Sequence, residues 1–367
     1  MSIYLIIVAA VLILGAVMPQ KGRERIWYIA LMTAIHAFVC AFRYNHLTGD
    51  LMKYHNSFNL LSEASWFDTD VYNEGRNFGF MFLMKLIAEL TNDDFQMVLI
   101  VIAVITHLVL GGIIYRYSPA PWLSFLVWNC MALYIFGFSA IKQALSMSVV
   151  MLSFIAISRK KPILYLAFMA IAGMIHMPAL IFLPAYWMAQ MKVKKYTIIL
   201  YAVLGILLYV FKEQFVKFIS SFYYDEDEVF VFSGEIGNRF IMLMGFTLFG
   251  LMFRGFHNRD YEKLFHVMAV ATILQMLAGF DNIFTRMSDY YFQFSVLYIP
   301  MTFAEGGKMV RHEALKPWFP FNKRSMRAIT ALIVIFVIWF YYTYTINVDI
   351  AYAVDDYTNF RFMWDVK

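Results

Sequence analysis

The sequence predicts an all-α polytopic integral membrane protein, and three observations lead to this prediction. The chain has 367 residues, of which 62% are hydrophobic and only 15% charged, and its mean hydropathy is +0.63. A typical soluble domain has about 25% charged and about 45–50% apolar residues. Aromatic residues make up 19% of the chain, which suits interfacial belts and lipid-facing surfaces. Apolar runs of membrane-spanning length recur along most of the sequence.

These apolar runs predict the transmembrane helices. They are 2–18, 26–42, 96–114, 119–138, 139–158, 197–211, 240–256, 264–280, 288–305 and 328–346. No basic segment precedes the first run, so we interpret it as a membrane helix and not as a cleaved signal peptide. With two further segments, the runs predict about 11–12 transmembrane or half-membrane helices in a single transmembrane domain, 1–367.

The two further segments have lengths that do not match one full span. Phe78–Leu90 is apolar but would be only about 20 Å long as a helix, so we favour a re-entrant segment that does not cross. Pro162–Met188 is too long for one comfortable span and short for two, and His176-Met177-Pro178 interrupts it. Because proline disfavours helix in the residue before it, we predict two half-length helices that meet inside the membrane.

The distribution of Lys and Arg predicts the orientation. If 78–90 does not cross and 162–188 returns to its own side, every compact basic loop falls on one side, which is then cytoplasmic. If 78–90 crosses, the basic loop at 159–161 moves to the opposite side. In the favoured topology the segments 43–77, 212–239 and 347–367 lie outside. Their Tyr, Phe, Trp, Asp and Asn residues suit sugar binding, although ordinary polar loops with interfacial aromatics are the simpler alternative.

Ionisable side chains gather at the predicted outer boundary. They are Arg43, Asp50, Lys142, His176, Arg239 and Arg286. Each has a structural alternative: Arg43, Arg239 and Lys142 can snorkel to the interface, and Arg286 can pair with Asp289 three residues later. His176 is costly in its apolar run unless a partner satisfies it, and a backbone carbonyl freed by Pro178 is one such partner.

Cations around one histidine predict an electropositive pocket that attracts a pyrophosphate. Other chemistries have little support. The sequence has no glycine-rich phosphate loop, no His-Glu-x-x-His metal motif and no Gly-x-Ser-x-Gly elbow. The acidic run Asp225–Glu228 is better explained as solvated charge than as a cation site, and no metal site is predicted. Cys40 and Cys130 lie in apolar runs and are interpreted as buried small hydrophobes.

Five stretches resemble motifs of the EpsG family of bacterial polysaccharide-synthesis membrane proteins, a branch of the Wzy-type polymerases. They are Phe42-Arg43 followed by Gly49-Asp50-x-x-x-Tyr54-x-x-x-Phe58, then Asn77-Phe78-Gly79-Phe80-Met81-Phe82-Leu83, Ile141-Lys142-Gln143-Ala144-Leu145-Ser146, Ile175-His176-Met177-Pro178-Ala179-Leu180-Ile181, and Thr285-Arg286 leading into Tyr290, Tyr291 and Ile299-Pro300. Three positions depart from the family pattern. Asn77 replaces the usual Glu, and Thr48 precedes Gly49 where the family has Thr before Asp. Lys142 replaces Arg, which keeps the charge but loses bidentate geometry.

The resemblance implies a glycosyltransferase of the GT-C-like type that joins undecaprenyl pyrophosphate-linked oligosaccharide repeats en bloc. The reaction is expected on the outer face of the bacterial cytoplasmic membrane, with neither nucleotide sugar nor cofactor. The product would be capsule, O-antigen or exopolysaccharide. The expected partners are the lipid-linked oligosaccharide and the lipid bilayer, with a chain-length regulator as a further candidate and no nucleic acid.

The combined hypothesis gives each candidate residue a role. His176, Asp50 and Arg286 are the catalytic candidates, with His176 or Asp50 as general base, or His176 bonded to phosphate. Arg43, Lys142 and Arg286 would hold the pyrophosphate, Arg239 would bind substrate, and Tyr54 and Tyr290 would line the acceptor groove.

Two other functions remain as alternatives. One is a membrane-bound acyltransferase that modifies a surface glycan, since such enzymes also use a histidine at a membrane boundary. The other is a transporter of lipid-linked oligosaccharide, for which internal repeats and charges near the bilayer midplane are expected.

Overall fold

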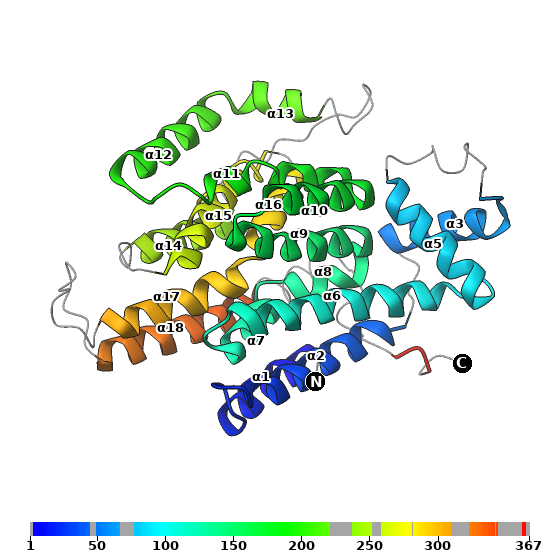
Figure 1. Cartoon of the computed structure of the whole chain (residues 1–367), viewed down its shortest axis with the longest axis horizontal. Coiled ribbons are helices and arrows are strands. Elements are labelled where there is room, and N and C mark those ends of the chain that lie inside the picture. The colour runs from blue at the N-terminus through cyan, green and yellow to red at the C-terminus, as the bar shows by residue number, and fades with distance from the viewer. Residues whose placement is uncertain are drawn as a thin grey trace.

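The computed structural model describes residues 3–44, 49–66, 77–220, 237–251, 258–280, 282–309, 323–341, 343 and 362–364. Helices make up nearly all of this described part, and its only β-type pairing is an isolated bridge between Arg43 and Phe362 (Figure 1). The all-α class predicted from the sequence is therefore confirmed, whereas the number of spans and the GT-C likeness stay predictions.

The helices follow the predicted apolar runs closely. In chain order they are α1 (Ile3–Val17), α2 (Arg25–Ala41), α3 (Gly49–Glu63), α5 (Phe78–Thr91), α6 (Phe95–Tyr117), α7 (Pro121–Cys130), α8 (Leu133–Ser139), α9 (Ile141–Arg159), α10 (Pro162–Ile175), the 3-10 helix η1 (Met177–Phe182), α11 (Ala185–Met188), α12 (Lys195–Val210), α13 (Lys212–Ser220), α14 (Asn238–Leu251), α15 (Arg259–Met276), α16 (Asn282–Phe292), α17 (Ser295–Met309) and α18 (Lys323–Tyr341).

Some of these helices have the length and composition of membrane spans. By themselves α6 and α9 are long and apolar enough to cross a bilayer. Counting each bent pair as one span raises the number to four within the described residues, because α7 and α8 meet at 70° and α12 and α13 at 82°. Shorter apolar helices, including α1, α2, α10 and α14, add to them. This pattern supports a membrane protein.

The predicted run 119–138 consists of two helices, because the chain breaks at Met131 and Ala132 between α7 and α8. Ala132 has a left-handed φ of +58°. One turn earlier, the Asn129 amide donates to Phe125 O at 2.8 Å and to His36 Nε2 at 2.7 Å. An amide side chain bonded to the preceding turn competes with the helix, which accounts for a break without proline.

The predicted run 288–305 likewise consists of two helices. Helix α16 begins earlier, at Asn282, and α17 resumes at Ser295 after a break at Gln293 and Phe294. The outer segment 43–77, expected as a loop, contains the 15-residue helix α3. Of the other two outer segments, 221–236 and all of 347–367 except 362–364 lie outside the described residues, as does the acidic run Asp225–Glu228.

The interruption predicted in 162–188 is present at His176, which has extended backbone angles between α10 and η1. The second half is not a regular α-helix but the 3-10 helix η1 followed by the single turn α11. Pro178 at the start of η1 and Pro184 before α11 each remove a backbone donor, which explains the short elements. Helix η1 folds back tightly on α10, because a Cβ on Gly173 would lie 2.8 Å from Leu180 Cδ2.

Helices α3 and α5 lie at one end of the molecule, at the right of Figure 1. Their apolar residues form a second hydrophobic cluster beside the main core, together with the beginnings of α6 and α9. Phe58 and Leu61 of α3 and Phe80 and Met84 of α5 are buried in it. Helix α5 has 14 residues, so it is about 21 Å long and shorter than a hydrocarbon core of about 30 Å.

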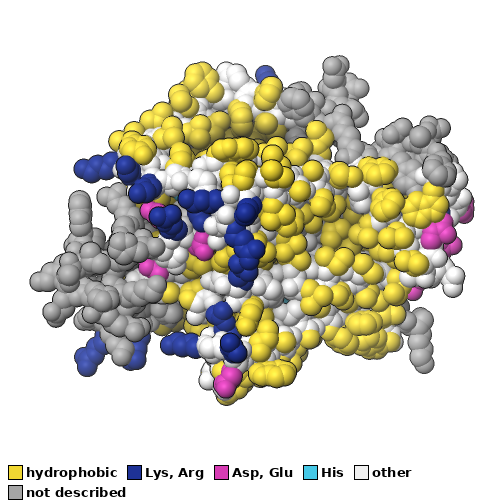
Figure 2. All heavy atoms as spheres, in the orientation of Figure 1, with side chains coloured by type: hydrophobic (Ala, Val, Ile, Leu, Met, Phe, Trp, Pro, Cys, Tyr) yellow, Lys and Arg dark blue, Asp and Glu magenta, His cyan; other side chains and the backbone are white. Residues whose placement is uncertain are grey.

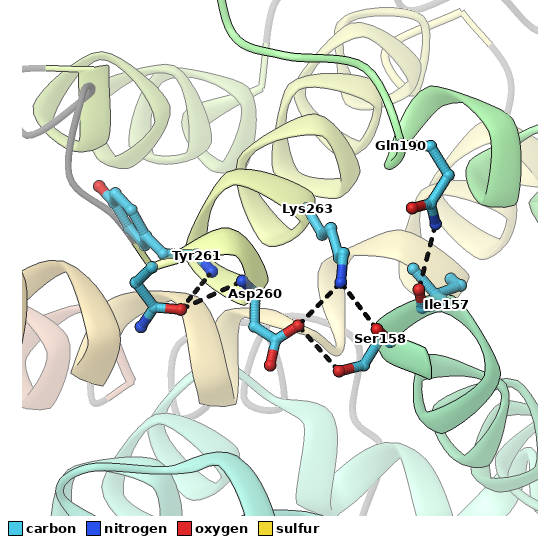
Figure 3. A network of polar contacts seen from close by, with 7 residues as sticks. Ile157, Ser158, Gln190, Asp260, Tyr261 and Lys263 are labelled. Atoms are coloured by element: carbon cyan, nitrogen blue, oxygen red, sulfur yellow. Dashed lines mark hydrogen bonds and ion pairs between the residues drawn. The ribbon is translucent and has the colours of Figure 1, made fainter. Parts of the chain in front are cut away.

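Basic side chains gather at the opposite end, at the left of Figure 2, where the cytoplasmic loops were predicted. A polar network ties two helices together there (Figure 3). Lys263 Nζ of α15 donates to Ser158 O and to Asp260 Oδ1, both at 3.0 Å. Gln190 donates to Ile157 O at 3.1 Å. Two carbonyls in the last turn of α9 thereby have side-chain donors.

This arrangement predicts which positions are reachable from outside the cell. In a background with the buried cysteines replaced (Cys40→Ala, Cys130→Ala), Asn59→Cys on α3 should react with a membrane-impermeant maleimide in intact cells. Lys161→Cys, between α9 and α10, should react only after permeabilisation. Both positions are exposed in the structure, so labelling of Lys161→Cys in intact cells would contradict the orientation.

Candidate functional site

A cavity of about 380 Å³ lies where α3, α5, α9 and α16 meet the break between α10 and η1. It is lined by Asp50, Lys53, Tyr54, Ser57, Asn77, Phe80, Met81, Met84, Ala140, Lys142, Gln143, His176 and Arg286. Five of the eight predicted site residues are therefore brought together, from segments far apart in the sequence. The roles assigned to them stay predictions.

Three α-helices begin at this cavity. Asp50 lies in the first turn of α3, Asn77 immediately precedes α5, and Ala140 immediately precedes α9. Neither Asn77 nor Ala140 caps its helix with a side-chain hydrogen bond. The first backbone N–H groups of a helix carry partial positive charge, so these beginnings favour an anion in the cavity.

The charged side chains of the cavity are mostly cations. Lys53, Lys142 and Arg286 face a single carboxylate among the described lining residues, Asp50, which leaves an excess of two positive charges. Arg286 Nη2 lies 3.8 Å from Asp50 Oδ2, and both side chains are partly exposed, at 49% and 32%. An exposed pair at this distance is weak, so both groups remain available to a ligand.

Tyr54 links α3 to the cation of α9. The Lys142 ammonium lies 5.7 Å from the centre of the Tyr54 ring, and Phe80 packs edge-on against the same ring. Burial raises the pKa of the Tyr54 phenol, and the nearby Asp50 carboxylate raises it further. Tyr54 is therefore a neutral phenol that offers a hydrogen bond and an aromatic face at the cavity wall.

The partner of His176 is a side chain. His176 Nδ1 lies 2.5 Å from the hydroxyl of Tyr290 on α16, with the two rings stacked at 25°. The alternative of a bond to a backbone carbonyl is thus wrong for this nitrogen. Tyr290 itself is fully buried and does not line the cavity, contrary to the groove position expected for it.

Short contacts hold the wall helices in place. Gln143 of α9 donates to Arg286 O of α16 at 2.9 Å, and Ser146 of α9 donates to Ala172 O of α10 at 2.9 Å. Gly79, in the first turn of α5, packs against the backbone of Met174 in α10, where a Cβ would meet the Met174 carbonyl carbon at 3.0 Å. This close approach needs a residue without a side chain.

Two predicted cations lie outside the cavity. Arg43 is 4% exposed, and its guanidinium donates to Cys40 O and to Phe138 O, the latter at 2.9 Å. It closes the end of α2 and does not snorkel. Arg239 pairs with Asp289 and lies 4.3 Å from the centre of the Phe292 ring. Asp289 therefore has Arg239 as its partner and not Arg286, its neighbour one turn away.

Other lining residues were not among the predicted site residues. Lys53 lies one turn after Asp50 on α3, and that spacing was the available signal. Gln143 follows Lys142 directly in a stretch already noted for its resemblance. Among the described residues, no group of three His, Cys, Asp or Glu side chains is placed to hold a metal ion.

Comparison with known protein families gives one match. The EpsG family model matches residues 26–359, which is nearly the whole chain and includes every residue of the cavity. No curated protein and no solved structure matches.

The contact between Gly79 and Met174 yields a stability prediction. Gly79→Val should push α5 away from α10 and destabilise the protein by about 1–3 kcal/mol, as overpacking does. Thermal unfolding of the detergent-purified protein measures the effect. The control is Gly112→Val on α6, since a Cβ at Gly112 meets nothing within 4 Å. Equal melting temperatures for the two variants would show that the contact is not tight.

Proposed function

This chain belongs to the EpsG family, and we propose that it is a polysaccharide polymerase that joins lipid-linked oligosaccharide repeats on the outer face of the cytoplasmic membrane. In the proposed reaction, a hydroxyl oxygen of the acceptor repeat attacks the anomeric carbon of the donor chain. The bond from that carbon to the undecaprenyl pyrophosphate breaks, and the pyrophosphate leaves on its lipid. The proton of the hydroxyl passes to a base.

The excess of positive charge in the cavity carries this proposal. A departing pyrophosphate develops negative charge, and preorganised cations and backbone N–H groups stabilise such charge strongly in a site with little water. Lys142 and Arg286 come from different helices, so they can hold two sides of one pyrophosphate, and Lys53 adds a third charge. The volume of about 380 Å³ is within the usual range for a small-ligand pocket, about 300–1,000 Å³.

The position of the cavity supports the same function. Helix α9 has 19 residues, so its ends are about 28 Å apart, close to the thickness of a hydrocarbon core. The cavity lies at its beginning, and the basic loop 159–161 lies at its end. A substrate that arrives on the outer leaflet would present its pyrophosphate at this depth.

The residue roles follow from these positions. Lys142, Arg286 and Lys53 bind the pyrophosphate, and Tyr54 offers a stacking face and a hydroxyl to the sugar beside it. Asp50 or His176 receives the proton. Arg43, expected at the pyrophosphate, and Arg239, expected to bind substrate, have no role in this proposal, because their guanidinium groups are engaged elsewhere.

Alanine substitution of the cations tests the proposal in a strain lacking the wild-type gene. Arg286→Ala and Lys142→Ala should each lower polymer formation by about 10²–10³-fold, the usual cost of removing one group that stabilises developing charge. Single lipid-linked repeats should accumulate. Arg286→Lys should retain part of the activity, because it keeps the charge but loses the fork geometry.

The matched control is Lys195→Ala, an exposed cation at the start of α12 and outside the cavity. It should support polymer of normal length at the same protein level on an immunoblot. Normal polymer from Arg286→Ala and Lys142→Ala would reject the site. Full-length polymer that lacks acyl groups in the deletion strain would indicate an acyltransferase, and repeats retained on the cytoplasmic leaflet would indicate a transporter.

A further inference from the structure

His176 offers only one ring nitrogen to the cavity. Its Nδ1 is bonded to the Tyr290 hydroxyl at 2.5 Å, and Tyr290 is completely buried on α16 behind the cavity wall. His176 is itself 9% exposed and lines the cavity. The nitrogen left for a ligand is therefore Nε2.

The chemistry of this pair determines which nitrogen carries the proton. A phenol is a far stronger acid than a neutral imidazole N–H, so in a hydrogen bond between them the phenol donates and the imidazole nitrogen accepts. When Tyr290 donates to Nδ1, the proton of the neutral ring is on Nε2. Lys142 and Arg286 line the same cavity and oppose a positive charge on the ring.

We propose that Tyr290 is a positioning residue that fixes this tautomer, so that His176 donates a hydrogen bond from Nε2 to the anion in the cavity and is not the general base. The inference rests on the proposed polymerase function and assigns the base within it. Asp50 is the carboxylate that the described lining offers, and it is bonded only loosely to Arg286, at 3.8 Å.

In the proposed step, the acceptor hydroxyl transfers its proton to an oxygen of Asp50 as the new glycosidic bond forms. His176 keeps its Nε2 proton throughout and shares it with a phosphate oxygen of the leaving group. Tyr290 keeps its own proton as well. Protonation neutralises the Asp50 carboxylate, and breaking the bond to the anomeric carbon adds one negative charge to the pyrophosphate. Charge and protons therefore balance.

Substitutions of His176 distinguish a hydrogen-bond donor from a general base at this position. A glutamine amide nitrogen reaches close to the position of Nε2 and can donate, but the amide does not take up a proton. His176→Gln should therefore retain activity within about tenfold of wild type, whereas His176→Ala should lose about 10–100-fold, the range for one hydrogen bond to a charged group. Asp50→Asn should lose about 10²–10⁴-fold, the range for general-base catalysis.

The measurement is the initial rate of polymer formation in membrane vesicles that contain the strain's own lipid-linked repeats. His176→Gln should restore most of the rate that His176→Ala loses, whereas Asp50→Asn should remain low. A rate in His176→Gln as low as in His176→Ala, together with a rate in Asp50→Asn near that of wild type, would make His176 the base and overturn the inference.

Tyr290→Phe tests the positioning role without changing the packed volume. Alone it should lower the rate by about 3–30-fold, since it removes one buried hydrogen bond to a catalytic group. In the His176→Gln background it should have little further effect, because the tautomer no longer matters. Independent, additive losses would overturn the positioning role. The polymerase proposal fails separately, if wild-type vesicles do not consume lipid-linked repeats at all.

Discussion

An excess of positive charge at one point of a membrane protein needs an anion to offset it, and much of this fold converges on such a point. Lys53, Lys142 and Arg286 face one carboxylate, and three helices begin at the same cavity. Water screens these charges in part, since the Arg286 and Asp50 side chains are 49% and 32% exposed, and a bound anion would reduce the remaining repulsion between the cations. The short helix α5 and the broken segment at His176 have a simple explanation in this context. Helix α5 begins at the cavity, and α10 ends at His176 in its wall.

Helix α9 connects the cavity to the opposite end of the molecule, and hydrogen bonds fix it at both ends. At its end, Lys263 and Gln190 satisfy the carbonyls of Ser158 and Ile157. At its beginning, Gln143 donates to the backbone of α16 next to the side chain of Arg286. This bond fixes the backbone of α9 and α16 at the positions from which the Lys142 and Arg286 side chains extend. The Tyr290–His176 bond ties α16 to the end of α10. The site is held by neighbouring helices and not by one long loop.

Sequence patterns predicted what depends on local chemistry. The apolar runs gave the helices, and the polar His176 before Pro178 gave the interruption of 162–188. The predictions that failed concern contacts between residues far apart in the sequence. A charge at a helix end can turn outward to water or inward to carbonyls, so Arg43 could not be placed from its neighbours alone. Asp289 is one turn from Arg286, yet it pairs with Arg239, fifty residues away. The break at Met131 rests on Asn129 side-chain bonds that no proline or glycine signals.

The departures from the family pattern fit the same electrostatic logic. Asn77 lines the cavity at a position where the motif that this stretch resembles has a glutamate, and a carboxylate there would lower the excess of positive charge from two to one. Lys142 stands in place of an arginine and lacks its planar fork, but its ammonium is placed over the Tyr54 ring, 5.7 Å from its centre. Arg286 still supplies bidentate geometry from the opposite wall. This chain therefore combines one cation of planar, directional geometry with two compact ammonium groups in a single cavity.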